Sequence, residues 1–227
     1  MTWIKICGNT NLEDALAAVE AGADAVGFIF APSSRRIDPK TAEAMVAQLP
    51  ETLEKVGVYV NESAEHIREI VEQVHLTAVQ LHGDESPDFA RNLFRRPGRA
   101  RRSRLRVFKA LPVHTGIERA LREFAHTRGI AAVLLDSAAH DSESPRGGTG
   151  WAFDWGRAAT FVPGVAERVR VILAGGLTPA NVTQAIQVLS PWGVDVCSGV
   201  ERSPGKKDPA RMRAFVAAVR ATRAKKT

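Results

Sequence analysis

The feature that most constrains the fold is an alternation of short apolar runs with amphipathic stretches along the whole chain. Several of the short runs are rich in Val and Ile, which is typical of strands buried in a parallel sheet. The segments between them, such as LEDALAAVEAG and AEHIREIVEQV, place apolar residues three and four positions apart, as amphipathic helices do. We therefore predict strands at residues 3–7, 25–30, 55–60, 78–81, 107–111, 132–135, 171–174 and 194–197.

Four dipeptides mark predicted helix starts, because each places a good helix-capping residue directly before a proline. They are Asp38-Pro39, Ser86-Pro87, Thr178-Pro179 and Asp208-Pro209. The capping side chain accepts a hydrogen bond from a backbone N–H of the first turn, and proline lacks an N–H that would have no partner there. We expect a helix to begin at each pair.

Strands that alternate with helices in this way fit either a closed barrel or an open, doubly wound sheet. The open sheet usually carries GxGxxG after its first strand, whereas CGNTN stands there in this chain. A length of 227 residues suits one barrel, and no linker or internal repeat divides the chain. The sequence therefore predicts the α/β class, with a single (β/α)8 TIM barrel over residues 1–227.

Composition and cysteine content favour an ordinary globular protein from a reducing compartment. Hydrophobic residues make up 44% of the chain and charged residues 25%. Two cysteines, Cys7 and Cys197, imply no disulfide framework. We recognise neither a signal peptide nor an apolar run long enough to span a membrane. We therefore expect a cytoplasmic protein without membrane contact.

The net charge of +6 is compatible with binding to nucleic acid or to an anionic small molecule, and it is also compatible with no anionic partner. Much of the positive charge lies in an arginine-rich stretch near 95–106, which we interpret as a basic loop inserted before the fifth strand. The stretch has no interleaved aromatic residues, and with the basic tail it makes two separate clusters. Nucleic-acid binding is therefore the weaker alternative, and it would make affinity fall steeply with salt.

Active sites of such barrels lie at the carboxyl ends of the strands, where Cys7 and Asp136 stand. Strand alternation puts Lys5 and Cys7 on one face, and a cation there would favour the thiolate and make Cys7 a usable base. The alternative is a buried, inert cysteine. For Asp136, catalysis, ligand binding and helix capping all remain open, because a carboxylate ending a core strand needs some partner.

Two glycine-containing strings, LAGGLTP and DVCSGVE, end the seventh and eighth predicted strands. Loops in these positions often bind phosphate in barrels, because glycine lets backbone N–H groups approach an anion closely. A simple turn is the alternative for either string alone. We predict a phosphate-binding nest formed by Gly175, Gly176, Ser198 and Gly199.

Basic and aromatic-ring nitrogen donors follow two further strands. Arg35 and Arg36 follow the second, where one of them could hold a substrate carboxylate by two parallel hydrogen bonds while the other is solvated. His82 ends the fourth strand and either supports substrate binding or caps the next helix. The sequence groups no further ligands with His82, so we expect no metal and no cofactor.

Taken together, the strings at these positions resemble the motif series of the phosphoribosylanthranilate isomerase family. In order they are KICGNT, DAVGFIF, VGVYVN, QLHGDE, LLDS, GGTGWAFDW, LAGGLTPANV and DVCSGVERSPGKKD. KICG alone is moderately specific, whereas the ordered set is highly specific and spans nearly the whole chain. The resemblance implies a TIM-barrel enzyme that converts N-(5-phosphoribosyl)anthranilate to 1-(2-carboxyphenylamino)-1-deoxyribulose 5-phosphate, an Amadori rearrangement in tryptophan biosynthesis.

The resemblance also implies roles for individual residues. Cys7 matches the family's general base and Asp136 its general acid. Arg35 matches the arginine of the S-x-R-x-[IV] pattern that contacts the anthranilate carboxylate, with Arg36 as its substitute because the loop is short. Asp195 is expected to pair with Lys5 inside the barrel. The family's phosphate-binding positions match the residues of the predicted nest, Gly175, Gly176, Ser198 and Gly199.

The chain departs from the family's pattern at two further positions: Asn9 replaces an aliphatic residue, and Cys197 replaces serine and adds a second thiol near the mouth. A related phosphosugar isomerase of histidine biosynthesis is the closest rival. Its chemistry is parallel, but its enzymes resemble a pattern with two aspartates, where Cys7 stands here. The sequence leaves the oligomeric state as a monomer or a homodimer.

Overall fold

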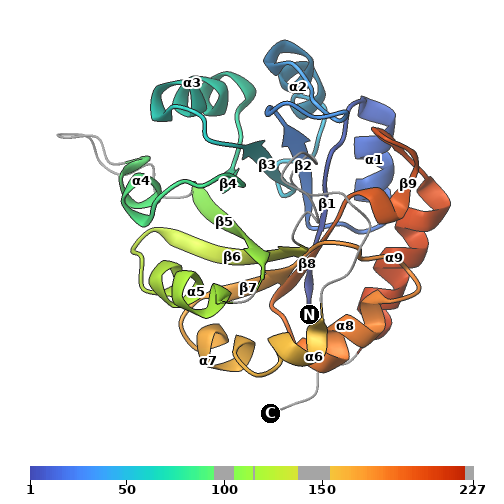
Figure 1. The fold of residues 1–227 in the computed structure, drawn as a ribbon. Helices are drawn as coiled ribbons and strands as arrows, with labels where there is room; N and C mark the ends of the chain where they lie inside the picture. The colour runs from blue at the N-terminus through green and yellow to red at the C-terminus, as the bar shows by residue number, and fades with distance from the viewer. Residues whose placement is uncertain (95–104, 115, 138–153, 223–227) are drawn as a thin grey trace.

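The computed structural model describes residues 1–94, 105–114, 116–137 and 154–222, and these form a closed barrel of parallel strands (Figure 1). Each strand is hydrogen-bonded to the next in the sequence, and β8 pairs back with β1. The strands are β1 (Trp3–Ile6), β2 (Ala25–Ile29), β3 (Glu54–Tyr59), β4 (Ala78–Leu81), β5 (Arg106–Val113), β6 (Ile130–Ser137), β7 (Arg170–Leu173) and β8 (Gly193–Val196). The predicted (β/α)8 barrel is confirmed.

Every predicted strand is present, but two of them are longer than predicted. The pairing of β5 with β6 continues as far as Val113 and Ser137. Asp136 is therefore held within a hydrogen-bonded strand, opposite Pro112, instead of following one. Cys7, by contrast, stands one residue beyond β1.

Helices surround the barrel on the outside, as Figure 1 shows. They are α1 (Leu12–Glu20), α2 (Pro39–Val46), α3 (Ala64–Val74), α4 (Pro87–Asn92), α5 (Ile117–Ala125), α6 (Trp155–Ala158), α7 (Val162–Ala166), α8 (Val182–Leu189) and α9 (Pro209–Ala221). None of these helices, in the part of the chain that the structure describes, is long and apolar enough to cross a membrane.

Three of the four predicted helix starts are confirmed, because Asp38, Ser86 and Asp208 cap α2, α4 and α9. The prediction at Thr178-Pro179 is wrong, since α8 begins at Val182. The cause is the side chain of Asn181, which accepts a hydrogen bond from Thr178 N at 2.8 Å and donates one to Gly176 O at 2.9 Å. These bonds hold 178–181 as a turn against the loop after β7.

The barrel interior is a packed apolar core below a polar upper layer. Its buried members are Trp3, Ala25, Val56, Ala78, Phe108, Ala110, Ala132, Leu134, Ile172 and Ala174. At the amino-terminal end of the barrel Trp3 stacks on Trp192, with ring centroids 5.0 Å apart, and Arg106 is ion-paired with Glu54. Among the described residues, these side chains close this end of the barrel interior.

A short 3₁₀ turn, η1 (Ser198–Val200), and a hairpin follow β8. The hairpin consists of β9 (Glu201–Ser203) and β10 (Lys206–Lys207), which pair in antiparallel fashion. Thr10 Oγ1, in the loop after β1, donates a hydrogen bond to Gly205 O in the hairpin at 2.6 Å. The hairpin therefore lies beside the mouth of the barrel, next to the loop that carries Cys7.

The interior packing can be tested at Phe108, which is 1% exposed and meets Trp3 edge-on with centroids 5.8 Å apart. We expect Phe108→Ala to lower the free energy of unfolding by about 3–5 kcal/mol, because it removes apolar contacts and leaves a cavity. Urea unfolding followed by circular dichroism measures the loss. Val188→Ala on the exposed face of α8 is the control, with an expected loss below about 0.5 kcal/mol. Equal losses would contradict the packed interior.

Candidate active site

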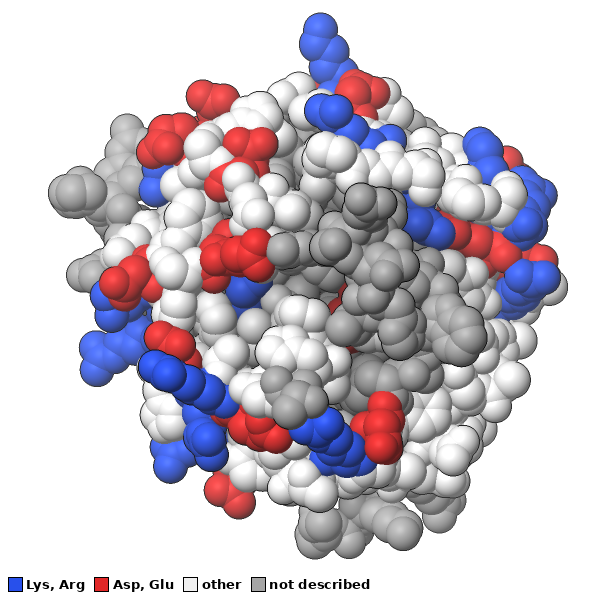
Figure 2. Space-filling view, in the orientation of Figure 1, with Lys and Arg blue, Asp and Glu red and all other residues white. Residues whose placement is uncertain are grey.

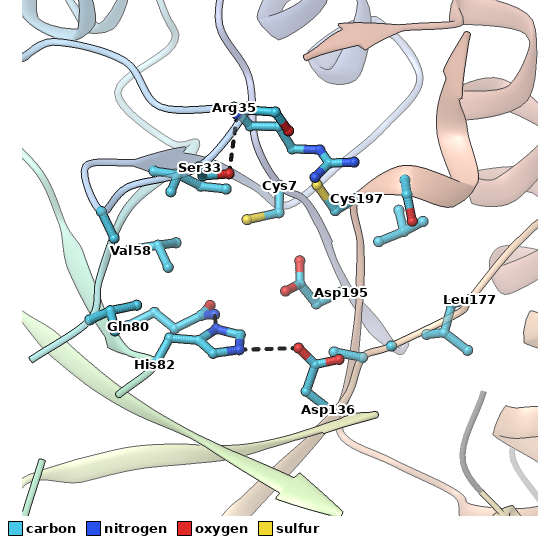
Figure 3. A pocket seen from close by; sticks show the side chains of 18 of the residues that line it. Cys7, Ser33, Arg35, Val58, Gln80, His82, Asp136, Leu177, Asp195 and Cys197 are labelled. Carbon is cyan, nitrogen blue, oxygen red and sulfur yellow. Dashed lines mark hydrogen bonds and ion pairs between the residues drawn. The ribbon is translucent and has the colours of Figure 1, made fainter. Parts of the chain in front are cut away.

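A cavity of about 410 Å³ opens at the carboxyl ends of the strands. Figure 3 shows its labelled side chains, which come from both sides of the barrel. Most of the residues predicted for the site line it together: Cys7, Arg35, His82, Asp136, Gly175, Gly176, Asp195 and Ser198. Arg36 and Gly199 are absent from the lining. Residues scattered over the sequence are thus brought into one pocket.

Cys7 enters this pocket from the end of β1 and is only 5% exposed. Its backbone N–H donates to Val196 O at 2.8 Å, so the strand pairing of β1 with β8 places the thiol. Burial raises the pKa of Cys7 above its ordinary value, and the charge of Lys5 lowers it by less. Lys5 thus acts in the predicted direction, but it does not make Cys7 a thiolate in the unliganded protein.

Lys5 and Asp195 form a buried ion pair directly beneath the thiol, with Nζ and Oδ2 2.9 Å apart. This confirms the expected pairing across β1 and β8. Burial alone would lower the pKa of Lys5, but the negative charge of Asp195 raises it above its ordinary value. Lys5 therefore remains a cation next to Cys7.

Asp136 enters the pocket from the opposite wall and is held by His82 (Figure 3). His82 Nε2 lies 3.1 Å from Asp136 Oδ2, and His82 Nδ1 lies 2.9 Å from Gln80 Nε2. With Gln80 Nε2 as the donor to Nδ1, the tautomer that fits these contacts has its proton on Nε2, facing Asp136. Asp136 Oδ1 has no hydrogen-bond partner among the described residues.

His82 does not cap the next helix, because Ser86 does so. Its contact is with the carboxylate of Asp136 instead. Gln80 was missed by the sequence analysis, although its position two residues before His82 puts both side chains on the inward face of β4. Strand alternation was therefore the signal that could have found it.

The predicted nest brings together the loops after β7 and β8. Gly175 has a φ of +74°, and a Cβ there would lie 2.6 Å from Asp136 Oδ1 and 2.3 Å from Ser137 N. A Cβ on Gly199 would lie 1.9 Å from Leu177 O. Glycine is thus required for these two loops and the end of β6 to approach one another. Gly175, Gly176 and Ser198 border the cavity, while Gly199 packs behind them.

Arg35 lines the pocket, whereas Arg36 is exposed and forms a backbone bridge with Ile29. The Arg35 guanidinium donates to both carboxylate oxygens of Glu201, at 2.8–3.1 Å. Hydrogen bonding to Glu201 raises the pKa of Arg35 further. Glu201 was not singled out from the sequence, because nothing local links it to an arginine so far away along the chain.

Cys197 also lines the pocket, at the end of the strand next to Cys7. The register pairs Ile6 with Val196, the residues that directly precede the two cysteines. Both cysteines are free. Burial raises the pKa of Cys197 to about 12, so this side chain is a neutral thiol at physiological pH.

The arginine-rich stretch is only partly visible, since 95–104 lie outside the described residues, as does 147–153 of the string GGTGWAFDW. Arg106 is described and is engaged by Glu54 at the closed end of the barrel. On the face in Figure 2, Lys and Arg side chains are interspersed with Asp and Glu. Among the described residues, no group of His, Cys, Asp and Glu side chains could hold a metal ion.

The fold and the site together define a (β/α)8-barrel enzyme with its pocket at the carboxyl ends of the strands. The chain belongs to the phosphoribosylanthranilate isomerase family, because residues 4–218 match the family model described as N-(5'-phosphoribosyl)anthranilate (PRA) isomerase. The N-(5'-phosphoribosyl)anthranilate isomerase of Pelobacter propionicus is 43% identical over 228 residues, which cover 100% of each chain.

Solved structures of this family are similar along nearly their whole length. A crystal structure of phosphoribosyl anthranilate isomerase in complex with reduced 1-(o-carboxyphenylamino)-1-deoxyribulose 5-phosphate is 40% identical, with a TM-score of 0.79. The match covers 97% of this chain and 99% of that one. A structure of monomers generated from the dimeric enzyme of Thermotoga maritima is also 40% identical, with a TM-score of 0.78 and the same coverage.

The close approach at Gly175 predicts a local clash on substitution. We expect Gly175→Ala to destabilise the protein by more than the roughly 1–3 kcal/mol of backbone strain alone, because its Cβ also meets Ser137 N. Gly116→Ala is the matched control, since Gly116 has a φ of +90° with no atom within 4 Å of an added Cβ. Thermal unfolding of both variants measures the difference, and equal destabilisation would contradict the close approach.

The environment of Cys7 predicts how its reactivity depends on pH. In a Cys197→Ser background, we expect the rate of alkylation by iodoacetamide to rise with a midpoint above that of free cysteine, because burial raises the thiol pKa. Lys5→Met combined with Asp195→Asn, which leaves no unpaired buried charge, should move this midpoint to still higher pH, since the charge of Lys5 lowers the pKa of Cys7 by more than that of Asp195 raises it. Lys40→Met, on exposed α2 surface, is the control and should leave it unchanged. An unchanged or lower midpoint in the double variant would contradict this account.

Proposed function

We propose that Cys7 and Asp136 are the base and the acid with which this chain isomerises N-(5-phosphoribosyl)anthranilate. The product is 1-(2-carboxyphenylamino)-1-deoxyribulose 5-phosphate, and the reaction is the Amadori rearrangement of tryptophan biosynthesis. One observation carries the proposal: a thiol from β1 and a carboxylate from β6 line the same pocket, whose rim carries glycine loops and an arginine. Membership of the family supplies the substrate.

The reaction begins with Asp136 in its protonated form. Asp136 gives its proton to the ribose ring oxygen, the bond from that oxygen to C1′ breaks, and a Schiff base forms with the amine. His82 Nε2 lies 3.1 Å from Oδ2, and Oδ1 is buried against Gly175, so the carboxyl group is held in place on both sides. General acid catalysis of this kind is typically worth about 10²–10⁴-fold.

Cys7 gives up its own proton to solvent and then, as a thiolate, removes the proton from C2′. The electrons of that C–H bond form a double bond between C1′ and C2′, which gives an enolamine. Protonation at C1′ and loss of the hydroxyl proton at C2′ produce the ketone. Because burial disfavours the thiolate, the cation of Lys5 beneath it, itself held by Asp195, is the group that stabilises this charge.

The two ends of the substrate are anions, and each has a complementary group at the rim. We assign the phosphate to the backbone nest of Gly175, Gly176, Ser198 and Gly199, and the anthranilate carboxylate to Arg35, not to the exposed Arg36. Both anions are remote from C1′ and C2′. Their binding energy can therefore align the sugar between Cys7 and Asp136.

We also propose a cytoplasmic location, which is supported by the two free cysteines at the pocket. The oligomeric state in this proposal is a monomer or a homodimer. Assays with the phosphosugar substrate of the rival isomerase of histidine biosynthesis should give no comparable turnover. Binding to nucleic acid, titrated at two salt concentrations, should be weak at both.

The roles of acid and base are tested by Cys7→Ala and Asp136→Asn. We expect each variant to lose about 10²-fold or more in kcat, because each lacks one proton-transfer group, with a smaller change in KM. Turnover is followed by the loss of anthranilate fluorescence. Asp88→Asn, on the exposed surface of α4, is the matched control and should keep wild-type activity. Full turnover by either active-site variant would refute the assignment.

A further inference from the structure

A buried cluster of three charged side chains lies beside the mouth of the barrel. Glu201, at the start of the β9–β10 hairpin, accepts hydrogen bonds from Arg35 on one side and from Lys207 Nζ, at 3.0 Å, on the other. Gly205 N also donates to Glu201, at 3.2 Å. The side chain of Glu201 is 4% exposed and that of Lys207 is 0% exposed.

The geometry of the Arg35–Glu201 pair leaves only part of the guanidinium for a ligand. Glu201 engages Nε at 2.9 Å and Nη2 at 2.8 Å, which is the side-on fork of the guanidinium. Within the described residues, Nη1 makes no hydrogen bond. The remaining donors, on Nη1 and the second hydrogen of Nη2, form the end-on fork, which matches the two oxygens of one carboxylate.

Lys207 offsets the negative charge that Glu201 brings next to Arg35. A carboxylate next to Arg35 would by itself cancel the charge that attracts an anion, but the cation of Lys207 returns the cluster to a net positive charge. Burial alone would raise the pKa of Glu201, but hydrogen bonds from Arg35 and the charge of Lys207 lower it below its ordinary value. Glu201 is therefore ionised at neutral pH.

The same lysine also reaches the loop after β8. Lys207 Nζ donates to Cys197 O at 3.2 Å, directly before Ser198 of the predicted phosphate nest. Its backbone N–H is bound by Asp14 Oδ2 at 2.9 Å, so the hairpin is fixed against α1. The cluster is thus anchored on several elements, and it cannot turn with Arg35 as a flexible surface pair could.

We propose that Glu201, backed by Lys207, is a positioning residue that restricts Arg35 to its end-on fork and thereby selects substrates with a carboxylate on the aromatic ring. The inference rests on the proposed function, because it takes Arg35 as the group that meets the anthranilate carboxylate. Glu201 does not touch the reacting atoms. It acts through the orientation of Arg35, so its effect depends on whether the substrate carries a carboxylate.

The test compares two substrates in the same variants. For Glu201→Gln we expect KM for N-(5-phosphoribosyl)anthranilate to rise roughly tenfold or more, because a charge-assisted bidentate contact is misaligned, with kcat within about threefold of wild type. For N-(5-phosphoribosyl)aniline, which lacks the carboxylate, the same substitution should change KM by less than about twofold. Glu201→Asp, which keeps the charge but draws it back by one methylene, should show the same selectivity and serves if Glu201→Gln does not fold.

Glu54→Gln is the matched control, because Glu54 is a buried glutamate that also binds an arginine, Arg106, through Nε and Nη2. It lies at the closed end of the barrel, so any loss it causes reports general destabilisation and should not depend on the carboxylate. Equal losses on both substrates in the Glu201 variants, or a loss in kcat with KM unchanged, would overturn the positioning role. Failure of the wild-type protein to turn over either substrate would instead overturn the proposed function.

Discussion

The closure of the barrel between β1 and β8 is the constraint on which the site depends. This seam joins residues 190 positions apart, and the buried pair of Lys5 with Asp195 bridges it. Such a pair adds little net stability, because the cost of removing two charges from water offsets most of their attraction. Removing one partner alone would leave an unpaired buried charge, which is strongly destabilising. The main effect of the pair is to keep the charged side chain of Lys5 in a fixed position next to Cys7.

The two ends of the barrel differ in how their side chains pack. At the amino-terminal end, Trp3 and Trp192 stack and Arg106 pairs with Glu54, which closes the interior. At the other end, glycines stand where a side chain would prevent close contact between loops, as at Gly175 beside Asp136. Packing therefore decides both where a ligand can enter and how closely backbone N–H groups can surround an anion.

Both groups of the proposed acid–base pair are buried and are held by neighbouring residues. Burial holds the pKa of the Cys7 thiol above its ordinary value, because it outweighs the nearby cation of Lys5. Asp136 has Oδ2 against His82 and Oδ1 buried against Gly175, so its carboxyl group is fixed in position. A site arranged in this way keeps its functional groups in fixed positions without exposing a reactive thiolate to solvent.

The amino-acid sequence alone predicts the strands and three of the four helix starts, and most of the site residues it predicts line the pocket. These are local properties, because strand alternation, apolar spacing and capping residues are read over a few positions. It also matched Cys7 and Asp136 to one family, since their motifs are contiguous.

Features that depend on contacts between distant segments emerge only when the chain is folded. The turn held by Asn181, the support of Asp136 by His82 and the pairing of Arg35 with Glu201, 166 positions away, have no local signature. The same holds for the pKa of Cys7, because burial is a property of the assembled barrel. Barrel closure brings these groups together, and no short stretch of sequence encodes the distances that result.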